Sequence, residues 1–295
     1  MAPIRLLLLD IDGVLTQGEA KALDLALLAR LAEMNRAARA DPTRPAVSLC
    51  TGRPAPYVEV MMQAIDGHLP AVFENGCGLY APREYRFLPH PRLGDGPAFA
   101  DARERLRALA RSGQVFFQPG KEYSLSLFPL DGVAVADLYP LAESALEAAR
   151  ASVDLVYSSS CLNVLPRGVN KGEGLRFLCE VAGFQLDEVL GVGDSDVDLQ
   201  FLALAGRSAA PANAADEGKR IVSYVSPRDT SEGVRDILRH FGLPLLNQRD
   251  ASPSRKTCCL ARASRTGSRR LPISACTGSS SGAKRSPHRQ RTLSG

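Results

Sequence analysis

The chain has 295 residues, of which 45% are hydrophobic and 23% charged, and a formal net charge of +4. This length is enough for one or two folded domains and excludes a peptide hormone or a wholly disordered protein. The charge is uneven, because residues 249–295 carry 11 Lys and Arg against Asp250 alone, which leaves 25 basic and 31 acidic residues and a net charge of −6 in residues 1–248.

The first elements along the chain predict an open α/β sheet. Residues 4–9 form a short apolar run, which is typical of a buried parallel strand. A helix over residues 20–40, a strand over 46–50, a helix over 54–65 and a strand over 71–74 follow. The apolar run is far shorter than the roughly 20 residues of a membrane helix, and no signal-peptide cleavage pattern follows it. We therefore expect a cytoplasmic protein without a membrane segment.

The pattern changes over about residues 79–166 and then returns. The middle part predicts strands and helices of an α+β domain, the strands at 115–117, 123–128, 155–157 and 162–165 and the helices at 98–111 and 137–151. The last part predicts a helix at 171–182, a strand at 189–192, a helix at 197–204, a strand at 221–225 and a helix at 232–241. We predict an α/β fold: a Rossmann-like open parallel sheet core, residues 1–79 and 167–248, with an inserted α+β domain, residues 80–166.

The remaining residues, 249–295, predict a basic, disordered tail. They are rich in Ser, Arg, Gly and Pro and have no sustained apolar period that could form a core. Three of the seven cysteines lie in this tail. The other four show no C-x-x-C spacing, which favours reduced thiols over disulfides or a zinc cluster; they are Cys50, Cys77, Cys161 and Cys179.

The first predicted strand leads into Asp10-Ile11-Asp12-Gly13. In open α/β sheets, ligands bind beyond the carboxyl ends of the strands, so two carboxylates at this place are well located for chemistry. One carboxylate could attack a substrate while the other transfers protons. Two alternatives remain open: an Asp-Gly turn with two solvated acids, and the metal-binding D-x-D of a nucleotide-sugar transferase.

Two further segments are typical of phosphate binding. Thr51-Gly52-Arg53 offers a hydroxyl, backbone N–H groups at a helix start and a cation, although simple turn chemistry would also explain it. Asn170 is placed to cap the next helix. Lys171 in the first turn opposes the helix dipole, which predicts a negative group nearby. A solvated lysine is the alternative.

A second group of acids follows the strand at 189–192. Asp194, Asp196 and Asp198 lie within five residues, and Asp194 could simply cap the next helix. If these acids converge with Asp10 and Asp12, like charges about 4 Å apart repel by about 4 kcal/mol per pair at an effective dielectric near 20. A divalent cation is then required, and oxygen ligands with a phosphate partner favour Mg²⁺.

Taken in order, these motifs resemble those of the haloacid dehalogenase superfamily of phosphohydrolases. The similarity covers about residues 4–245, with motifs at residues 10–16, 51–53, 171 and 193–198. The position of the inserted domain resembles the subgroup with a large α/β cap domain, which includes sucrose-phosphate, mannosyl-phosphoglycerate and phosphoglycolate phosphatases. The resemblance implies a Mg²⁺-dependent phosphatase that acts on a small phosphorylated metabolite, a sugar phosphate or a phosphoglycolate-like acid.

The resemblance also implies a role for each matched residue. Asp10 would form an aspartyl-phosphate and Asp12 would act as the general acid and base. Thr51, Gly52 and Lys171 would bind the phosphoryl group. Mg²⁺ would be held by Asp10, the Asp12 carbonyl and Asp194, with support from Asp198. Val197 departs from the family pattern, because family members usually carry Asn at this position. Without the hydrogen bond of that Asn, the metal site could be weaker.

Residues outside the phosphoryl site would contact the rest of the substrate. Arg53 adds positive charge, and Asn75 matches a family position often near the substrate. Lys121 lies in a polar turn, residues 118–122, between two predicted strands of the insert, where an exposed turn lysine is the alternative.

Two other functions stay open. A phosphomutase of the same fold would use the same site but protect its intermediate from water. A regulatory protein with a weakened site could bind a polyanion through its basic tail, but the acidic body and the lack of a nucleic-acid motif make nucleic acid an unfavoured partner. Sequence does not fix the oligomeric state.

Overall fold

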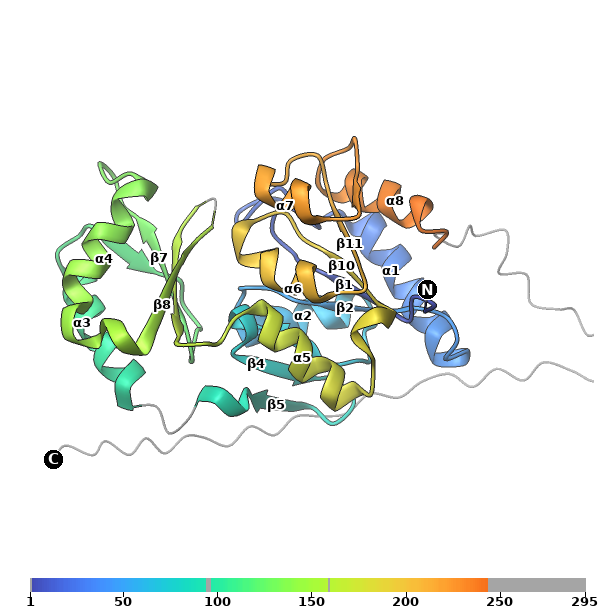
Figure 1. Ribbon diagram of the computed structural model, residues 1–295, viewed down its shortest axis with the longest axis horizontal. Coiled ribbons are helices and arrows are strands. Elements are labelled where there is room, and N and C mark those ends of the chain that lie inside the picture. The colour runs from blue at the N-terminus through green and yellow to red at the C-terminus, as the bar shows by residue number, and fades with distance from the viewer. Residues whose placement is uncertain (1, 94–96, 159, 244–295) are drawn as a thin grey trace, which may run out of the picture. The chain divides into compact units, whose positions relative to one another are not determined.

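The computed structural model describes residues 2–93, 97–158 and 160–243, so the predicted tail lies outside the described residues. A parallel sheet of five strands forms the centre, in the order β12-β11-β10-β1-β2 (Figure 1). The bounds are Leu6–Leu9 for β1, Ala46–Leu49 for β2, Val189–Val192 for β10, Arg207–Ala210 for β11 and Tyr224–Val225 for β12. This sheet confirms the predicted Rossmann-like core.

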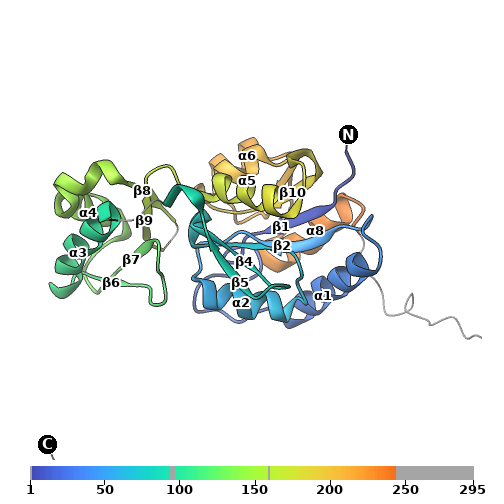
Figure 2. The same ribbon diagram turned by 90° about the horizontal axis from the view of Figure 1, so that it is seen from below.

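Helices cover both faces of this sheet (Figure 2). Side chains alternate along β1, so Leu7 and Leu9 pack on one face while Leu6 and Leu8 pack on the other. The first face carries α1 (Leu25–Ala40), α2 (Ala55–Ala64) and α8 (Thr230–His240). The second carries α5 (Lys171–Ala182) and α6 (Leu199–Leu204). Burial on both faces explains why the β1 sequence is continuously apolar.

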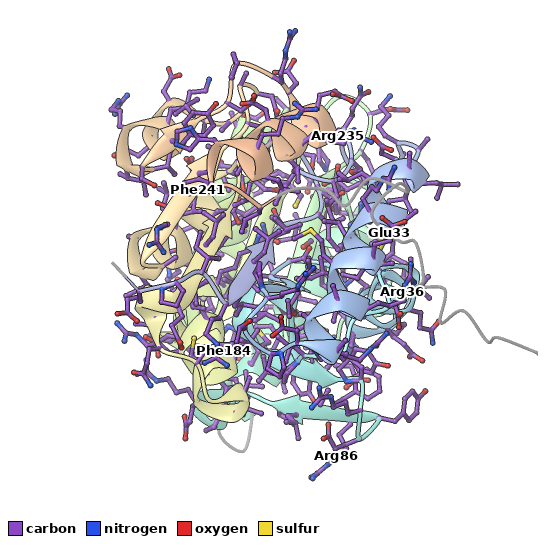
Figure 3. The ribbon with its side chains drawn as sticks, turned by 90° about the vertical axis from the view of Figure 1, so that its right-hand side faces the viewer. Glu33, Arg36, Arg86, Phe184, Arg235 and Phe241 are labelled. Atoms are coloured by element: carbon purple, nitrogen blue, oxygen red, sulfur yellow. The ribbon has the colours of Figure 1, made fainter. Side chains whose placement is uncertain are left out.

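A three-stranded antiparallel sheet, β3-β4-β5, follows β2. Its strands are Ala71–Phe73, Gly78–Ala81 and Arg86–Pro89, and a parallel bridge between Cys50 and Val72 joins β3 to the end of β2. The predicted boundary at residue 79 lies inside β4, which pairs with β3. Arg86 of the edge strand β5 projects away from the body of the molecule (Figure 3), and such charges oppose pairing with other chains.

Residues 97–166, which we call the insert, form a two-layer α/β unit with its own sheet. Four antiparallel strands have the order β6-β7-β9-β8, and α3 (Pro97–Arg111) and α4 (Leu138–Leu146) lie on one side of them (Figure 1). The strands are Val115–Phe117, Leu125–Pro129, Val153–Tyr157 and Leu162–Pro166 for β6, β7, β8 and β9. Leu125 and Leu127 join the apolar core under the helices, so Ser126 between them faces the other way.

Two predictions for the end of the core were incomplete. The strand expected at 221–225 is only β12, because Ile221 ends the short helix α7 (Asp216–Ile221). β11 was missed because its sequence, Arg-Ser-Ala-Ala, lacks an apolar run. Short 3₁₀ helices cover 74–76, 91–93, 135–137, 147–152, 186–188 and 196–198. Within the described ranges, no helix has the length and apolar character required to cross a bilayer.

Candidate active site

The predicted motifs meet at one edge of the parallel sheet. Asp10, Thr51 and Asp194 each follow the carboxyl end of a strand, β1, β2 and β10, and these strands are neighbours. They line one pocket together with Lys171. Nine of the ten residues that were given a catalytic, binding or metal-ligating role line it, and the tenth, Asp198, is completely buried beside Lys171.

Lys171 lies between two carboxylates. Its Nζ is 3.0 Å from Asp10 Oδ2 and 2.5 Å from Asp198 Oδ1, and the side chain is 1% exposed. Burial lowers the pKa of Lys171, but attraction by Asp10 and Asp198 outweighs it, so the pKa is raised and the amine is charged. The predicted negative partner is thereby confirmed, as is the Asn170 cap, whose side chain accepts a hydrogen bond from Glu173 N.

The pKa values of Asp10 and Asp194 are raised in this pocket. Burial raises the pKa of Asp10 to about 7, where the attraction of Lys171 opposes the repulsion by Asp198 and Asp12. Burial, followed by repulsion from Asp198 and Asp10, raises the pKa of Asp194 to about 9. One lysine therefore does not balance the acids in this pocket.

The carboxylates of Asp10 and Asp194 are suited to bind a divalent cation. Asp10 Oδ1 and Asp194 Oδ1 are buried without a hydrogen-bond partner, and ligand atoms of Asp10, Asp194 and Asp198 lie within 4.8 Å of one another. Carboxylate oxygens are suitable ligands for Mg²⁺. Asp198 is already occupied, because its oxygens accept hydrogen bonds from Lys171 Nζ and from the backbone N–H groups of Asp194 and Ser195. It therefore orients the Asp194 loop.

Gly13 permits the close approach of the first and last motifs. Its φ is +79°, and a Cβ at this position would lie 1.9 Å from Asp194 Oδ2. Any other residue would displace the carboxylate or strain the backbone. The glycine of the D-x-D-G motif is thus required by the packing of Asp194 against it.

Asp12 is held outside this cluster of three acids. Arg53 donates two hydrogen bonds to it, from Nε to Oδ2 at 2.6 Å and from Nη2 to Oδ1 at 2.7 Å, and the guanidinium lies over the Tyr57 ring. Burial lowers the pKa of Arg53, but the hydrogen bond and charge of Asp12 raise it further than burial lowers it. In this arrangement Asp12 lies at the pocket wall and is paired with Arg53.

The insert contributes a polar chain to the same pocket. Lys121 is 8% exposed, and its Nζ donates to Ser126 Oγ at 2.5 Å. Ser126 donates to Asn163 Oδ1 at 2.7 Å, and Asn75 Nδ2 of the core donates to the same oxygen at 3.3 Å. Burial lowers the pKa of Lys121 while the charge of Glu74 opposes that effect. The interpretation of Lys121 as an exposed turn lysine is therefore wrong.

Several pocket residues received no role at the site from the sequence. They are Glu19, Gln118, Ser126, Phe128, Ser158, Cys161, Asn163, Ser195 and Val197, of which Gln118, Ser195 and Val197 lie in segments that the sequence analysis considered. The signal for two of them was present. Ser126 and Asn163 are polar residues flanked by leucine and valine in strands, so alternation alone directs them away from the insert's apolar core.

Comparison with known proteins identifies a family and relatives that this chain resembles. Residues 144–238 match the family model of haloacid dehalogenase-like hydrolases. The phosphoglycolate phosphatase of Methanopyrus kandleri is 28% identical over 234 residues, covering 79% of this chain and 95% of the relative. That of Thermoplasma volcanium is 28% identical over 242 residues, covering 81% of this chain and 99% of the relative.

A solved structure shows a similar fold. The sucrose-phosphatase of Synechocystis sp., determined with sucrose and phosphate, has a TM-score of 0.60 at 19% identity, covering 82% of this chain and 99% of the other. At this identity the likeness concerns the fold alone. The fold, the ordered motifs and the sequence relatives agree, and the chain belongs to the haloacid dehalogenase-like hydrolases, among which it is a phosphatase.

Proposed function

We propose that this phosphatase hydrolyses a small phosphorylated carboxylic acid of the phosphoglycolate type, with Mg²⁺ as cofactor and an aspartyl-phosphate at Asp10. The observation that carries the proposal is the Asp10 carboxylate, which lines the pocket with one unpartnered oxygen, together with Thr51 and the charged Lys171. A nucleophile, a hydroxyl donor and a cation in one pocket are what phosphoryl transfer requires.

In the first step, a carboxylate oxygen of Asp10 attacks phosphorus. The new O–P bond forms as the bond from phosphorus to the leaving oxygen breaks, and the Asp12 carboxyl gives its proton to that oxygen. Arg53 has to release Asp12 for this proton transfer, which agrees with a second role for Arg53 at the substrate. Thr51 and Lys171 donate hydrogen bonds to the phosphoryl oxygens.

In the second step, the Asp12 carboxylate takes a proton from water. The water oxygen bonds to phosphorus, the bond between phosphorus and Asp10 breaks, and inorganic phosphate leaves. Asp10 and Asp194 would hold Mg²⁺, and Asp198 would orient Asp194. When bound, Mg²⁺ supplies positive charge that favours the ionised carboxylates and offsets the charge of the phosphoryl group.

The insert supports an acidic substrate. Lys121 is a buried amine whose Nζ donates to Ser126 Oγ, and among the described residues no carboxylate lies within ion-pair distance of it. A buried charge without a counter-ion is costly, so a substrate carboxylate would be favoured there. The relatives from Methanopyrus and Thermoplasma are phosphoglycolate phosphatases, in agreement with such a substrate.

The insert would then act as the cap predicted from the sequence. Gln118, Lys121 and Asn163 of the insert line the same pocket as the residues of the phosphoryl site. Hydroxyl groups of a sugar phosphate could also meet Asn75 and Asn163, so the two substrate classes need separate tests. The cytoplasmic location stays a prediction.

The experiment compares phosphoglycolate, glucose 6-phosphate and p-nitrophenyl phosphate as substrates, with Mg²⁺ and with EDTA. We expect hydrolysis only with Mg²⁺ and the highest kcat/KM for phosphoglycolate. Lys121→Met retains side-chain length but removes the charge, so it should reduce kcat/KM for phosphoglycolate about tenfold more than for p-nitrophenyl phosphate. A preference for glucose 6-phosphate, or an equal loss on both esters, would contradict the acidic-substrate proposal.

A further inference from the structure

Glu74 joins the core to the insert. It follows β3, is completely buried and has a φ of +48°, a backbone conformation that non-glycine residues seldom adopt. Its neighbour Asn75 lines the pocket, but the Glu74 side chain contacts the loop between β6 and β7. We propose that Glu74 is a positioning residue that anchors this loop to the core and thereby holds Lys121 at the substrate pocket.

The contact consists of four hydrogen bonds to one carboxylate. Glu74 Oε1 accepts from Glu122 N at 2.9 Å. Oε2 accepts from Tyr123 N at 3.0 Å, from Ser124 N at 2.8 Å and from Ser124 Oγ at 2.9 Å. Successive N–H groups that converge on one anion form a fixed cradle. The shape of the loop therefore depends on a carboxylate that belongs to the core.

Lys121 directly precedes this cradle. Arg103 of α3 donates to the carbonyl oxygens of Lys121 and Glu122, at 3.4 and 2.5 Å, so the backbone here is held from both sides. The negative charge of Glu74 also opposes the effect of burial on the pKa of Lys121. Glu74 thus holds Lys121 in position through hydrogen bonds to the neighbouring backbone. Its negative charge also favours the charged form of the lysine.

A merely structural role is the alternative, and it predicts different results. Without the carboxylate, three N–H groups of the loop, of which that of Ser124 is buried, lose their acceptor, which costs stability in either case. A positioning role adds a selective effect on substrates that use Lys121. The selective effect on substrates rests on the proposed function, whereas the anchoring of the loop does not.

The anchoring is tested by hydrogen exchange of the full chain. In Glu74→Gln, and in Glu74→Gly where the backbone strain is also relieved, the amides of residues 122–124 should exchange at least about tenfold faster. The matched control is Asp24→Asn, a carboxylate that accepts from Leu27 N at the start of α1 and pairs with Arg235 of α8, and it should change exchange at these two helices and not at residues 122–124. Unchanged exchange at residues 122–124 in folded Glu74 variants would overturn the proposal.

Ser124→Ala provides a milder variant if the Glu74 variants do not fold. It removes one of the four hydrogen bonds, that from Oγ, and leaves the carboxylate in place. It should accelerate exchange at residues 122–124 by a smaller factor. Exchange at the wild-type rate in this variant would count against the cradle.

The positioning is tested by kinetics. Glu74→Gln should raise KM for phosphoglycolate about tenfold, because small displacements of a binding group are costly, while kcat/KM for p-nitrophenyl phosphate changes less than about twofold. In a Lys121→Met background, Glu74→Gln should add no further loss for phosphoglycolate. Equal losses on both substrates, or additive losses in the double variant, would overturn it. If the wild type hydrolyses no phosphorylated acid, the proposed function fails, and hydrogen exchange alone decides the anchor.

Discussion

At the scale of single residues, charge balance explains both what could be predicted and what could not. Lys171 was recognisable because a cation in the first turn of a helix needs a negative partner, and the structure supplies Asp10 and Asp198. Glu74 was not recognisable. Its role depends on a left-handed backbone and on amides about 50 residues away in sequence, and no local pattern encodes either.

The pKa values of the buried acids predict how stability depends on pH. The pKa values of Asp10 and Asp194, about 7 and about 9 against 3.8 for a free side chain, are raised by burial in the folded protein. The folded state therefore binds more protons than the unfolded state. The contribution of these two acids to the free energy of unfolding is complete below about pH 4 and is lost as the pH rises through 7 and 9. We expect the Tm in EDTA to fall from pH 5 to pH 9.

Mg²⁺ should reverse this loss, because it binds the ionised carboxylates. Its stabilising effect should be larger at pH 9 than at pH 5, and Asp194→Asn should flatten the upper part of the pH dependence. Differential scanning calorimetry of both proteins with EDTA and with Mg²⁺ measures these effects. A Tm in EDTA that rises over this range, or an Asp194→Asn profile identical to that of the wild type, would contradict the assignment.

Val197 gives a second prediction at this scale. It is buried at the pocket beside Asp198. The family resemblance implies Asn at this position. An amide could hydrogen-bond the groups around the metal, and such outer contacts commonly change metal affinity by about 10- to 100-fold. We expect Val197→Asn to lower the Mg²⁺ concentration required for half-maximal activity. Val197→Leu, which adds no polar group, is the control, and equal Mg²⁺ requirements in both variants would refute the expectation.

At the scale of elements, the pattern of apolar residues predicted most helices and strands of the core. The residues typical of turns predicted few. α5 and β10 have the predicted bounds because a cap precedes the helix and a continuous apolar run forms the strand. β11 was missed because two of its four residues are polar. The hairpin of β4 and β5 was placed in the inserted domain, since only its pairing with β3 reveals its place in the fold.

The insert leads to a prediction at this scale. Replacing residues 97–166 with a short Gly/Ser linker leaves the hairpin of β4 and β5 paired with β3. The phosphoryl site of Asp10, Thr51 and Lys171 also stays intact, because it lies on the core. The shortened chain also carries Glu74→Gln, because the Glu74 carboxylate would otherwise lose its hydrogen-bond donors. We expect it to retain some hydrolysis of p-nitrophenyl phosphate and to lose its preference for phosphoglycolate. A shortened chain that folds and still ranks the substrates as the full chain does would show that specificity lies in the core.

At the scale of the whole molecule, the two functions of the site come from different layers. The parallel sheet presents the groups that any phosphate ester would meet, and the sheet of the insert presents the groups that would meet the rest of the substrate. The core sheet follows from its apolar strands. The insert's polar face could be anticipated only in part, because the distance between Lys121 and the core depends on the cradle around Glu74.

The central claim is that Asp10 carries the phosphoryl group during turnover. The most direct measurement is mass spectrometry of peptides from enzyme quenched in acid while it hydrolyses phosphoglycolate with Mg²⁺. In Asp12→Asn, where hydrolysis of the intermediate should be slowed by about 10²-fold or more, the peptide containing Asp10 should carry one added phosphoryl group, and in Asp10→Asn no label and no turnover should remain. A label on another residue, or near-normal turnover by Asp10→Asn, would contradict the account.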